Sequence, residues 1–341
     1  MTETIRVKSP EKARCNLALR AWRTNFQSVH PMNMSLIRNS MVPAFLCILL
    51  STLLTFLPVL DCYGAETKMQ DPAERTLRLL LVPEKNIFEQ RRQYKYITDY
   101  LSRKMGINVI VEIMAHYGDI SVAFQTGKAD AGFFGSFSYV LTHAKAGIEP
   151  VARPVWLDGS STYRGYIFVR KDSGIATVND MKNKNLVLVD RATTAGYIFQ
   201  RYYLKYYGID NMEDYFSRIS FARSHDAAAW AVYTGEADIG GAKNHIFNSL
   251  KEEYPDFKEQ MVVLAESPEV PSNCLAVRKD LNPALKLRLK TLLLSLHETP
   301  EGQEVLKNFR ARKFIETTDG DYEVLYKMVK ELDLDLHDYP D

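Results

Sequence analysis

Two adjacent threonines, Thr193 and Thr194, stand at a predicted strand-to-helix turn in the stretch DRATTAGYIF. The residues NLVLVD predict a strand that ends at Asp190, and a helix is expected to begin near Thr194–Gly196. The start of a helix offers unpaired N–H groups and the positive end of the helix dipole, and both suit an anion. The two hydroxyls add donors, and Gly196 would let the backbone approach a ligand closely. The pattern therefore indicates an anion site, although a threonine that only caps the helix gives the same pattern.

Three more polar side chains stand at places where a ligand would be held. His225 opens a predicted helix after a strand in ISFARSHDAAAW, where it would donate a hydrogen bond to an oxyanion. Tyr117 follows a predicted strand, and Tyr163 precedes a long extended run. A lone histidine is also common as a capping or surface residue, and such tyrosines are also common in packing. Each residue is therefore a candidate whose role depends on the fold.

A short motif, Thr-Gly-charged-Ala-Asp-x-Gly, occurs twice, as QTGKADAGFF (125–134) and YTGEADIGGA (233–242). The segments FVRKDSG and AVRKDLN form a second pair, and both pairs are 108 residues apart. This repetition predicts two lobes of similar topology in one chain. In each copy the first glycine is expected to end a helix with positive φ. Asp130 and Asp238 would then hold local backbone donors.

The segments that follow the two motifs are better candidates for contact with a ligand. Residues 134–138 and 242–245 lie where two short predicted strands end. Ser136 and Ser138 are the hydroxyl residues of the first segment. Ligands of open α/β sheets bind at the carboxyl ends of the strands. We therefore add these two serines to the predicted site.

The elements that must position these residues alternate between strand and helix. The pattern starts with a strand at 77–83 and a helix at 86–106 and continues through both halves of the chain. Such alternation predicts an α/β fold with mainly parallel sheets flanked by helices. The extended runs at 163–174 and 273–281 are interpreted as two crossover hinge strands between the lobes. We place lobe one at 75–168 plus 279–341 and lobe two at 169–278, with a closing cleft between them.

Composition agrees with a globular protein that has two cores. The chain has 341 residues, of which 46% are hydrophobic and 25% are charged, and its net charge is +1. The basic residues of the N-terminal region contrast with a nearly neutral remainder. No basic stripe is left there to favour nucleic acid.

The first 65 residues are interpreted as an N-terminal extension followed by a signal peptide or membrane segment. Residues 42–60, VPAFLCILLSTLLTFLPVL, are apolar or hydroxylic throughout, and Arg38 precedes them. We favour an export signal over an uncleaved anchor, with translation starting at Met32 or Met34 as an alternative. Lipidation at Cys62 is disfavoured because Asp61 stands where a small residue is expected.

Enzyme chemistry has little support in the sequence. Cys274 is the only cysteine after residue 65, and we expect it to be a buried apolar residue. The chain has no Gly-x-Ser-x-Gly elbow, no His-Glu-x-x-His and no Cys-x-x-Cys pair. We therefore predict no catalytic residues, no metal site and no cofactor.

Several of these stretches together resemble one family. Residues 75–330 are similar to the phosphate- and phosphonate-binding, PhnD-like proteins of ABC importers, within the type II periplasmic binding proteins. The resemblance is carried by HYGD, ADAGFFGSFSYVLTHA, YRGYIFVRKDSG, DRATTAGYIF, SHDAAAWAVYTGEADIG and SPEVPSNCLAVRKDL. It implies a two-lobed protein that closes on a phosphorus oxyanion and delivers it to a membrane permease.

The resemblance also implies roles for individual residues. Thr193 and Thr194 match the family's hydroxyl pair, His225 matches its oxyanion-binding histidine, and Tyr117 and Tyr163 match its two tyrosines. The position of the family's third hydroxyl holds Ala195.

The two carboxylates that hold an ammonium group in aminoalkylphosphonate binders are replaced by His245 and Asn273. This departure argues against an amino-substituted ligand and leaves phosphate, phosphite, methylphosphonate or another small anion.

The predicted function is thus an extracytoplasmic solute-binding protein that captures a small phosphorus oxyanion by hinge closure. Its partners would be a permease and the ATPase of an ABC importer. It would touch the membrane only through its signal or anchor segment or through the permease. The alternative is a ligand-sensing periplasmic module that signals to a membrane partner such as a sensor kinase.

Overall fold

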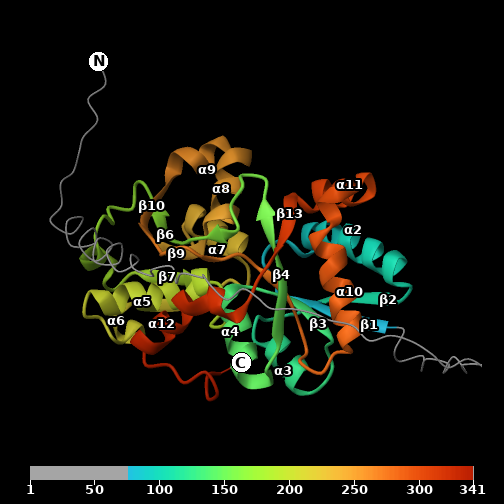
Figure 1. The fold of residues 1–341 in the computed structure, drawn as a ribbon. Coiled ribbons are helices and arrows are strands. Elements are labelled where there is room, and N and C mark those ends of the chain that lie inside the picture. Colours follow the sequence, from blue (N-terminus) through green and yellow to red (C-terminus); the bar gives the residue numbers. More distant parts are fainter. Residues whose placement is uncertain (1–75, 341) are drawn as a thin grey trace, which may run out of the picture. The chain divides into compact units, whose positions relative to one another are not determined.

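The computed structural model describes residues 76–340, which form two large sheets and one two-stranded ribbon (Figure 1). The predicted export signal at 42–60, the alternative starts and Cys62 lie outside this range. Within it, no helix combines the length and the apolar character that crossing a bilayer requires. We call the larger sheet and its helices lobe one, and the other sheet and its helices lobe two. Together they confirm the predicted α/β fold.

Lobe one contains a six-stranded sheet of order β13-β4-β12-β3-β1-β2. The strands are β1 (Thr76–Leu81), β2 (Asn108–Ile113), β3 (Ala131–Phe134), β4 (Glu149–Trp156), β12 (Cys274–Val277) and β13 (Ala311–Glu316). β1 is parallel to β2 and β3, whereas β12 is antiparallel to β3 and β4, and β13 is antiparallel to β4. The sheet is therefore mixed, with parallel pairing confined to three strands.

Helices cover both faces of this sheet. They are α2 (Ile87–Met105), α3 (Asp119–Gln125), α4 (Ser136–Ala146), α10 (Pro283–Leu294), η4 (Leu296–Glu298) and α11 (Pro300–Phe309). Successive side chains of a strand point to opposite faces. Leu79 of β1 accordingly joins the apolar cluster of α2, α10 and α11, whereas Leu80 joins that of α3 and α4.

Lobe two contains a five-stranded sheet of order β10-β6-β9-β7-β8. The strands are β6 (Gly165–Arg170), β7 (Asn185–Leu188), β8 (Arg218–Phe221), β9 (Ile239–Lys243) and β10 (Met261–Glu266). β7 is parallel to β8 and β9, and β6 is antiparallel to β9 and β10. Both sheets therefore have three parallel strands followed by an antiparallel one, as the sequence repeat predicted.

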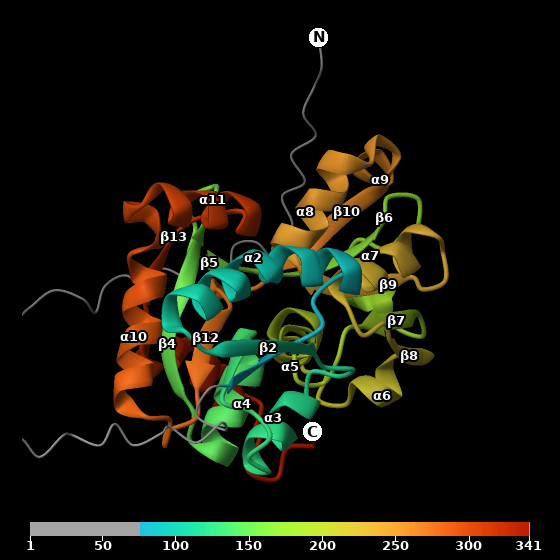
Figure 2. The same ribbon diagram turned by 90° about the vertical axis from the view of Figure 1, so that its right-hand side faces the viewer.

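The helical segments of lobe two follow its strands in turn (Figure 2). They are η2 (Val178–Met181), η3 (Thr194–Ile198), α5 (Phe199–Tyr206), α6 (Met212–Tyr215), α7 (His225–Tyr233), α8 (Asn244–Glu253) and α9 (Pro255–Gln260). α7 lies between the ends of β8 and β9, and α8 begins directly where β9 ends. This succession brings several helix starts to the carboxyl ends of strands.

The chain passes between the lobes through two short strands, β5 (Thr162–Tyr163) and β11 (Val270–Pro271), which pair in antiparallel fashion. β6 belongs entirely to the second sheet and β12 entirely to the first, because each pairs there on both sides. The predicted lobe boundaries at 168/169 and 278/279 therefore lie after these crossings. The two Val-Arg-Lys-Asp segments follow the crossings and do not form them.

The repeated motif has the structural role that the sequence predicted. Gly127 and Gly235 follow helices and have positive φ values of 67° and 81°. Oδ2 of Asp130 accepts the N–H of Arg78 at 2.9 Å, and Oδ2 of Asp238 accepts the N–H of Asn185 at 2.8 Å. Each aspartate thus ties the segment before β3 or β9 to the start of the neighbouring parallel strand.

The C-terminal segment contacts both lobes. It contains η5 (Asp319–Tyr322) and α12 (Glu323–Glu331). Nζ of Lys205 on α5 lies 2.7 Å from a carboxylate oxygen of Asp333, and Nζ of Lys145 on α4 donates to the carbonyl of Tyr339 at 2.6 Å. The predicted assignment of this segment to lobe one alone leaves out its contact with α5.

Candidate functional site

The turn between β7 and η3 forms the first part of the candidate site. The helix starts with a π-helical turn, in which the N–H of Ile198 bonds to the carbonyl of Thr193 at 3.0 Å. Gly196 lies against β7's end, where a Cβ would fall 2.4 Å from Cβ of Val189. The sequence assigned this glycine to close approach of a ligand. The structure instead shows that it lets the helix start pack against Val189.

The two threonines have different partners. Oγ1 of Thr193 donates to the carbonyl of Asp190 at 2.6 Å and so stays within its own loop. Oγ1 of Thr194 accepts the N–H of Phe137 at 3.0 Å. Phe137 lies in the first turn of α4 in lobe one, so Thr194 joins the two lobes. Both threonines are buried.

Ser136, Ser138 and Tyr163 lie at the start of α4 and at the first crossing. Oγ of Ser136 donates to the carbonyl of Pro271 at 2.6 Å and lies 2.9 Å from the hydroxyl of Tyr163. Oγ of Ser138 donates to the carbonyl of Gly135 at 3.0 Å, a bond within the first turn of its own helix. Ser136 and Tyr163 thus fasten α4 to the hinge strands, whereas Ser138 is engaged locally.

Tyr117 and His225 form the part of the site with free donors. Their ring centroids are 6.2 Å apart in an edge-to-face arrangement, and both side chains are buried. Nδ1 of His225 accepts the backbone N–H of Lys243 at 3.2 Å. In a neutral imidazole the other nitrogen, Nε2, then carries the proton. Among the described residues, neither this Nε2 nor the hydroxyl of Tyr117 has a hydrogen-bond partner.

Burial keeps both of these groups neutral. Burial and then the nearby charge of Lys243 lower the pKa of His225 to about 3. Burial and the charge of Glu84 raise the pKa of Tyr117 well above its ordinary value. Two neutral donors are therefore buried without an acceptor among residues 76–340. Buried polar groups normally have partners, so the pair is suited to receiving oxygen atoms of a ligand.

A buried ion pair lies beside these donors. The ammonium of Lys243, at the end of β9, contacts the carboxylate of Glu84 in the loop after β1, and donates to Oδ1 of Asn273 at 2.6 Å. It also lies 4.6 Å from the ring centroid of Tyr163. Burial alone would raise the pKa of Glu84, but Lys243 and its hydrogen bond hold that pKa below its usual value.

Glu84 and Lys243 are not among the residues predicted from the sequence. Each follows a strand, in VPEKN and GGAKNH, and Lys243 falls within the segment 242–245 that was singled out as a cleft candidate. Asn273, which the sequence did name, belongs to this cluster.

His245 lies apart from the cluster and next to the hinge. Its Nε2 is 3.1 Å from the carbonyl of Thr162, and its ring lies 6.4 Å from that of Trp156. The indole N–H of Trp156 in turn donates to Oγ of Ser272 at 2.9 Å. Whether His245 takes part in binding remains a prediction, because its contacts are with the crossing segments.

Backbone groups complete the contact between the lobes. Asp226 of α7 accepts the N–H of Asn86 at 2.9 Å, and Asp190 accepts the N–H of Tyr117 at 3.3 Å. Together with the Thr194 and Lys243 contacts, these bonds bring the carboxyl ends of strands of both sheets against each other. We call the seam in which these residues meet the closed cleft.

The chemistry that this arrangement supports is anion binding. The donors that it offers are the hydroxyl of Tyr117 and Nε2–H of His225. The start of η3, where Thr194 accepts a hydrogen bond from lobe one, belongs to the same seam. In the described part of the chain, no Ser, Thr or Cys hydrogen-bonds to His225, as a nucleophile would. No group of His, Cys, Asp and Glu within residues 76–340 is arranged to hold a metal ion.

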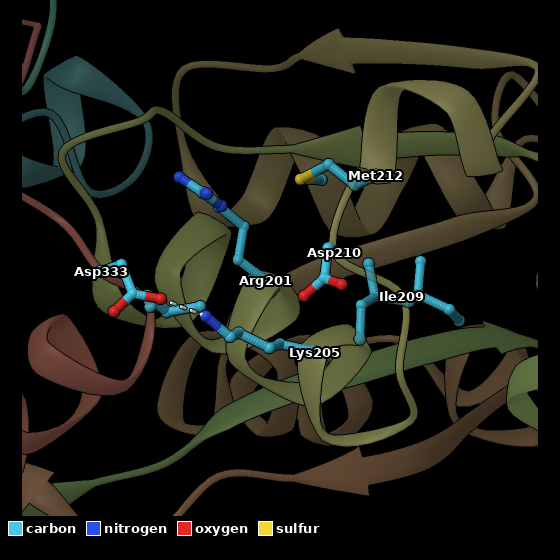
Figure 3. Close-up of a pocket in the computed structure, with 8 residues that line it drawn as sticks. Arg201, Lys205, Ile209, Asp210, Met212 and Asp333 are labelled. Carbon is cyan, nitrogen blue, oxygen red and sulfur yellow. Dashed lines mark hydrogen bonds and ion pairs between the residues drawn. The ribbon is translucent and has the colours of Figure 1, made fainter.

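A separate surface pocket lies between α5, α6 and the C-terminal segment (Figure 3). Arg201, Lys205, Asp210 and Asp333 supply its charged groups, and Lys205 and Asp333 pair with each other. This pocket contains none of the residues that the sequence predicted for the site. Its two cationic side chains share the pocket with two carboxylates, which makes it less suited to an anion. The closed cleft is therefore the better candidate.

Comparison with known proteins gives consistent matches. A family model described as "ABC transporter, phosphonate, periplasmic substrate-binding protein" matches residues 80–322. The phosphonates-binding periplasmic protein of Escherichia coli K12 is 23% identical over 250 residues, which are 72% of this chain and 73% of that protein. The phosphate-import protein PhnD of Mycolicibacterium smegmatis is 23% identical over 283 residues, with 77% and 88% covered.

A solved structure shows the same fold. PhnD1 from Prochlorococcus marinus, in complex with methylphosphonate, matches with a TM-score of 0.68 at 19% identity. The match covers 77% of this chain and 99% of that one. The predicted type II periplasmic binding protein fold is thereby confirmed.

Proposed function

Because the chain belongs to the family of periplasmic phosphonate-binding proteins of ABC transporters, we propose that it captures a small phosphorus oxyanion and delivers it to an ABC importer. Its family consists of substrate-binding proteins and not of enzymes. The family also implies a location outside the cytoplasmic membrane. A permease and its ATPase would be the partners that receive the ligand.

The observation that carries this proposal is the pair of unpartnered donors in the closed cleft. The hydroxyl of Tyr117 and Nε2–H of His225 are buried, neutral and without an acceptor among residues 76–340. An oxyanion would accept both hydrogen bonds, and bonds to a charged acceptor are roughly twice as strong as those between neutral groups. The start of η3 with Thr194 would complete the ligand shell, and Thr193, whose hydroxyl donates to Asp190, would support that turn.

The proposed ligand is phosphate, phosphite or an alkylphosphonate without an amino group. Its relatives' names include both a phosphate-import protein and a protein in complex with methylphosphonate. His245 and Asn273 stand where carboxylates would be needed to hold a ligand ammonium group. The other predicted ligand residues are Ser136, Ser138 and Tyr163, which we place in the supporting structure around the oxyanion.

The proposed mechanism is closure about β5 and β11. These two short strands connect lobes whose other contacts are hydrogen bonds, an ion pair and apolar packing. A ligand that touches Tyr117 in lobe one and His225 in lobe two binds the closed form better than the open form. It therefore shifts the population toward the closed form, which a permease would recognise.

Calorimetric titration with phosphate, phosphite and methylphosphonate tests this proposal. We expect at least one of them to bind, and Tyr117→Phe to weaken that binding by about 10- to 100-fold through loss of one charge-assisted hydrogen bond. Tyr322→Phe is the control, since its hydroxyl is also buried but its ring packs on Tyr139. Absence of binding to any phosphorus oxyanion would contradict the proposal.

A further inference from the structure

The proposed function gives no role to the buried ion pair of Lys243 and Glu84. The cleft contains a carboxylate of the kind that would hold a cationic group of a ligand. Here that carboxylate is neutralised by an ammonium from the protein itself. The side chains of Lys243 and Glu84 are only 9% and 16% exposed, so the pair is largely withdrawn from solvent.

The ammonium of Lys243 is fully occupied. It contacts Glu84, donates to Asn273 at 2.6 Å and lies 4.6 Å from the ring centroid of Tyr163. The group has three N–H donors, and these three neighbours surround it with a carboxylate, an amide oxygen and an aromatic ring. A second cation would find Glu84 already paired.

The pair lies next to the proposed oxyanion position. The backbone N–H of Lys243 donates to Nδ1 of His225, and the carbonyl of Glu84 accepts the backbone N–H of His225 at 3.1 Å. The charges of both side chains also act on His225, and that of Glu84 acts on Tyr117 as well. A phosphonate bound by these two donors would therefore have both charged side chains close by. Like charges are repelled more strongly in a buried site than in water, because the local dielectric is lower.

We propose that Lys243 is a specificity-determining residue, whose ammonium occupies the cation position against Glu84 and excludes phosphonates with an amino group. The inference rests on the proposed function and adds the residue that decides between ligand classes. It also predicts that the same cleft without Lys243 would accept an aminoalkylphosphonate, with the ligand's ammonium pairing with Glu84.

The test compares two ligands of nearly equal size, 2-aminoethylphosphonate and n-propylphosphonate, by calorimetric titration. The wild-type protein should bind n-propylphosphonate at least about tenfold more tightly, since the ligand ammonium meets Lys243. Lys243→Met keeps the length and apolar stem of the side chain and removes the charge. We expect it to reverse the preference in favour of 2-aminoethylphosphonate.

The double variant Glu84→Gln with Lys243→Met is the matched control. It lacks the carboxylate, so it should show no gain for 2-aminoethylphosphonate. Glu84→Gln alone leaves the charge of Lys243 without its carboxylate. This variant should bind n-propylphosphonate more tightly than the wild type does. Its preference for n-propylphosphonate over 2-aminoethylphosphonate should also be larger. If thermal unfolding shows that Lys243→Met does not fold, the comparison of Glu84→Gln with the wild type tests the inference instead.

The outcomes separate this inference from the proposed function. If the wild type binds no phosphorus oxyanion, the proposed function itself fails. If the wild type binds n-propylphosphonate but the ratio of the two affinities is the same in Lys243→Met, the inference is overturned and the proposed function stands. An unchanged ratio in Glu84→Gln would overturn it equally.

Discussion

At the scale of single residues, the cleft combines neutral donors with an internally balanced pair of charges. Tyr117 and His225 supply hydrogen bonds, while Glu84 and Lys243 cancel each other. Hydrogen bonds are electrostatically stronger in a buried site than in water. A small oxyanion would thus be held mainly by directed donors, which distinguish the number and position of its oxygen atoms.

His225 gives the protein a defined response to acid. Its pKa is lowered from 6.5 to about 3 by burial and then by the charge of Lys243. The unfolded chain therefore takes up this proton at a higher pH than the folded protein does. The stabilising contribution is complete above pH ~6.5 and is lost as the pH falls toward 3. Between these two pH values, each fall of one pH unit should lower the free energy of unfolding by about 1.4 kcal/mol through this residue.

Denaturant unfolding of wild type and His225→Gln in steps from pH 7 to pH 4 checks this expectation. The variant should show the shallower loss of stability with acid. Glu84, whose pKa is lowered below 4.5, adds an acid sensitivity of the same sign to both proteins, so the difference between them reports His225. His297→Gln, an exposed position in η4, should behave like the wild type. Identical slopes for wild type and His225→Gln would exclude the assignment.

The sequence pointed to single residues where a pattern of neighbouring residues marked them, and their role in binding stays a prediction. Tyr117, Thr194 and His225 each follow a strand, and the structure places all three in the cleft. Glu84 and Lys243 were missed because a single charged residue after a strand looks like a solvated one. Their meeting depends on the ends of β1 and β9, which belong to different lobes.

At the scale of elements, the repeated motif places an aspartate at the beginning of a parallel strand pair in each sheet. Asp130 and Asp238 each accept a backbone N–H at the start of the neighbouring strand, and neither belongs to the cleft. Their positions in the two sheets are equivalent, because β3 and β9 occupy the same place in the strand order. The repeat therefore reflects shared topology.

Asp238→Ala should lower the free energy of unfolding by about 1 kcal/mol, since the N–H of Asn185 loses its acceptor. Ligand affinity should stay within about twofold of the wild type, because the change lies at the opposite end of β9 from Lys243. Chemical denaturation followed by circular dichroism measures the first quantity and calorimetry the second. Glu236→Ala, an exposed change in the same motif, serves as the control. A large loss of affinity in Asp238→Ala would assign the motif to ligand binding instead.

Most elements were predicted from their periodicity, but β4 and β13 were not. β4 contains Pro150 and Pro154, which lack the N–H that a strand with partners on both sides normally donates. The structure accommodates this through an irregular register with β12 between Leu275 and Ala276. β13 is short and charged, and it is held by its pairing with β4. Long-range pairing of this kind has no local signal.

At the scale of the whole described region, closure brings many weak contacts together at once. One apolar cluster contains buried residues of both lobes, including Phe137 of α4 and Tyr197 of η3. Thr194 and Asp226 add hydrogen bonds across the same seam. Since these contacts form only when the lobes meet, the balance between open and closed forms should respond to a few additional hydrogen bonds from a ligand.

The position of Trp156 has a practical consequence for following that balance. Its indole N–H is bonded to Ser272 in the second crossing, and its ring stacks on Phe309 with centroids 5.9 Å apart. Bending of the crossings would alter the surroundings of this fluorophore. We expect its emission to change as methylphosphonate is added and to saturate at the calorimetric affinity. Trp156→Phe should abolish the signal, whereas a signal that persists would come from one of the other two tryptophans, Trp22 or Trp230. The protein would then report its own occupancy optically, without an attached dye.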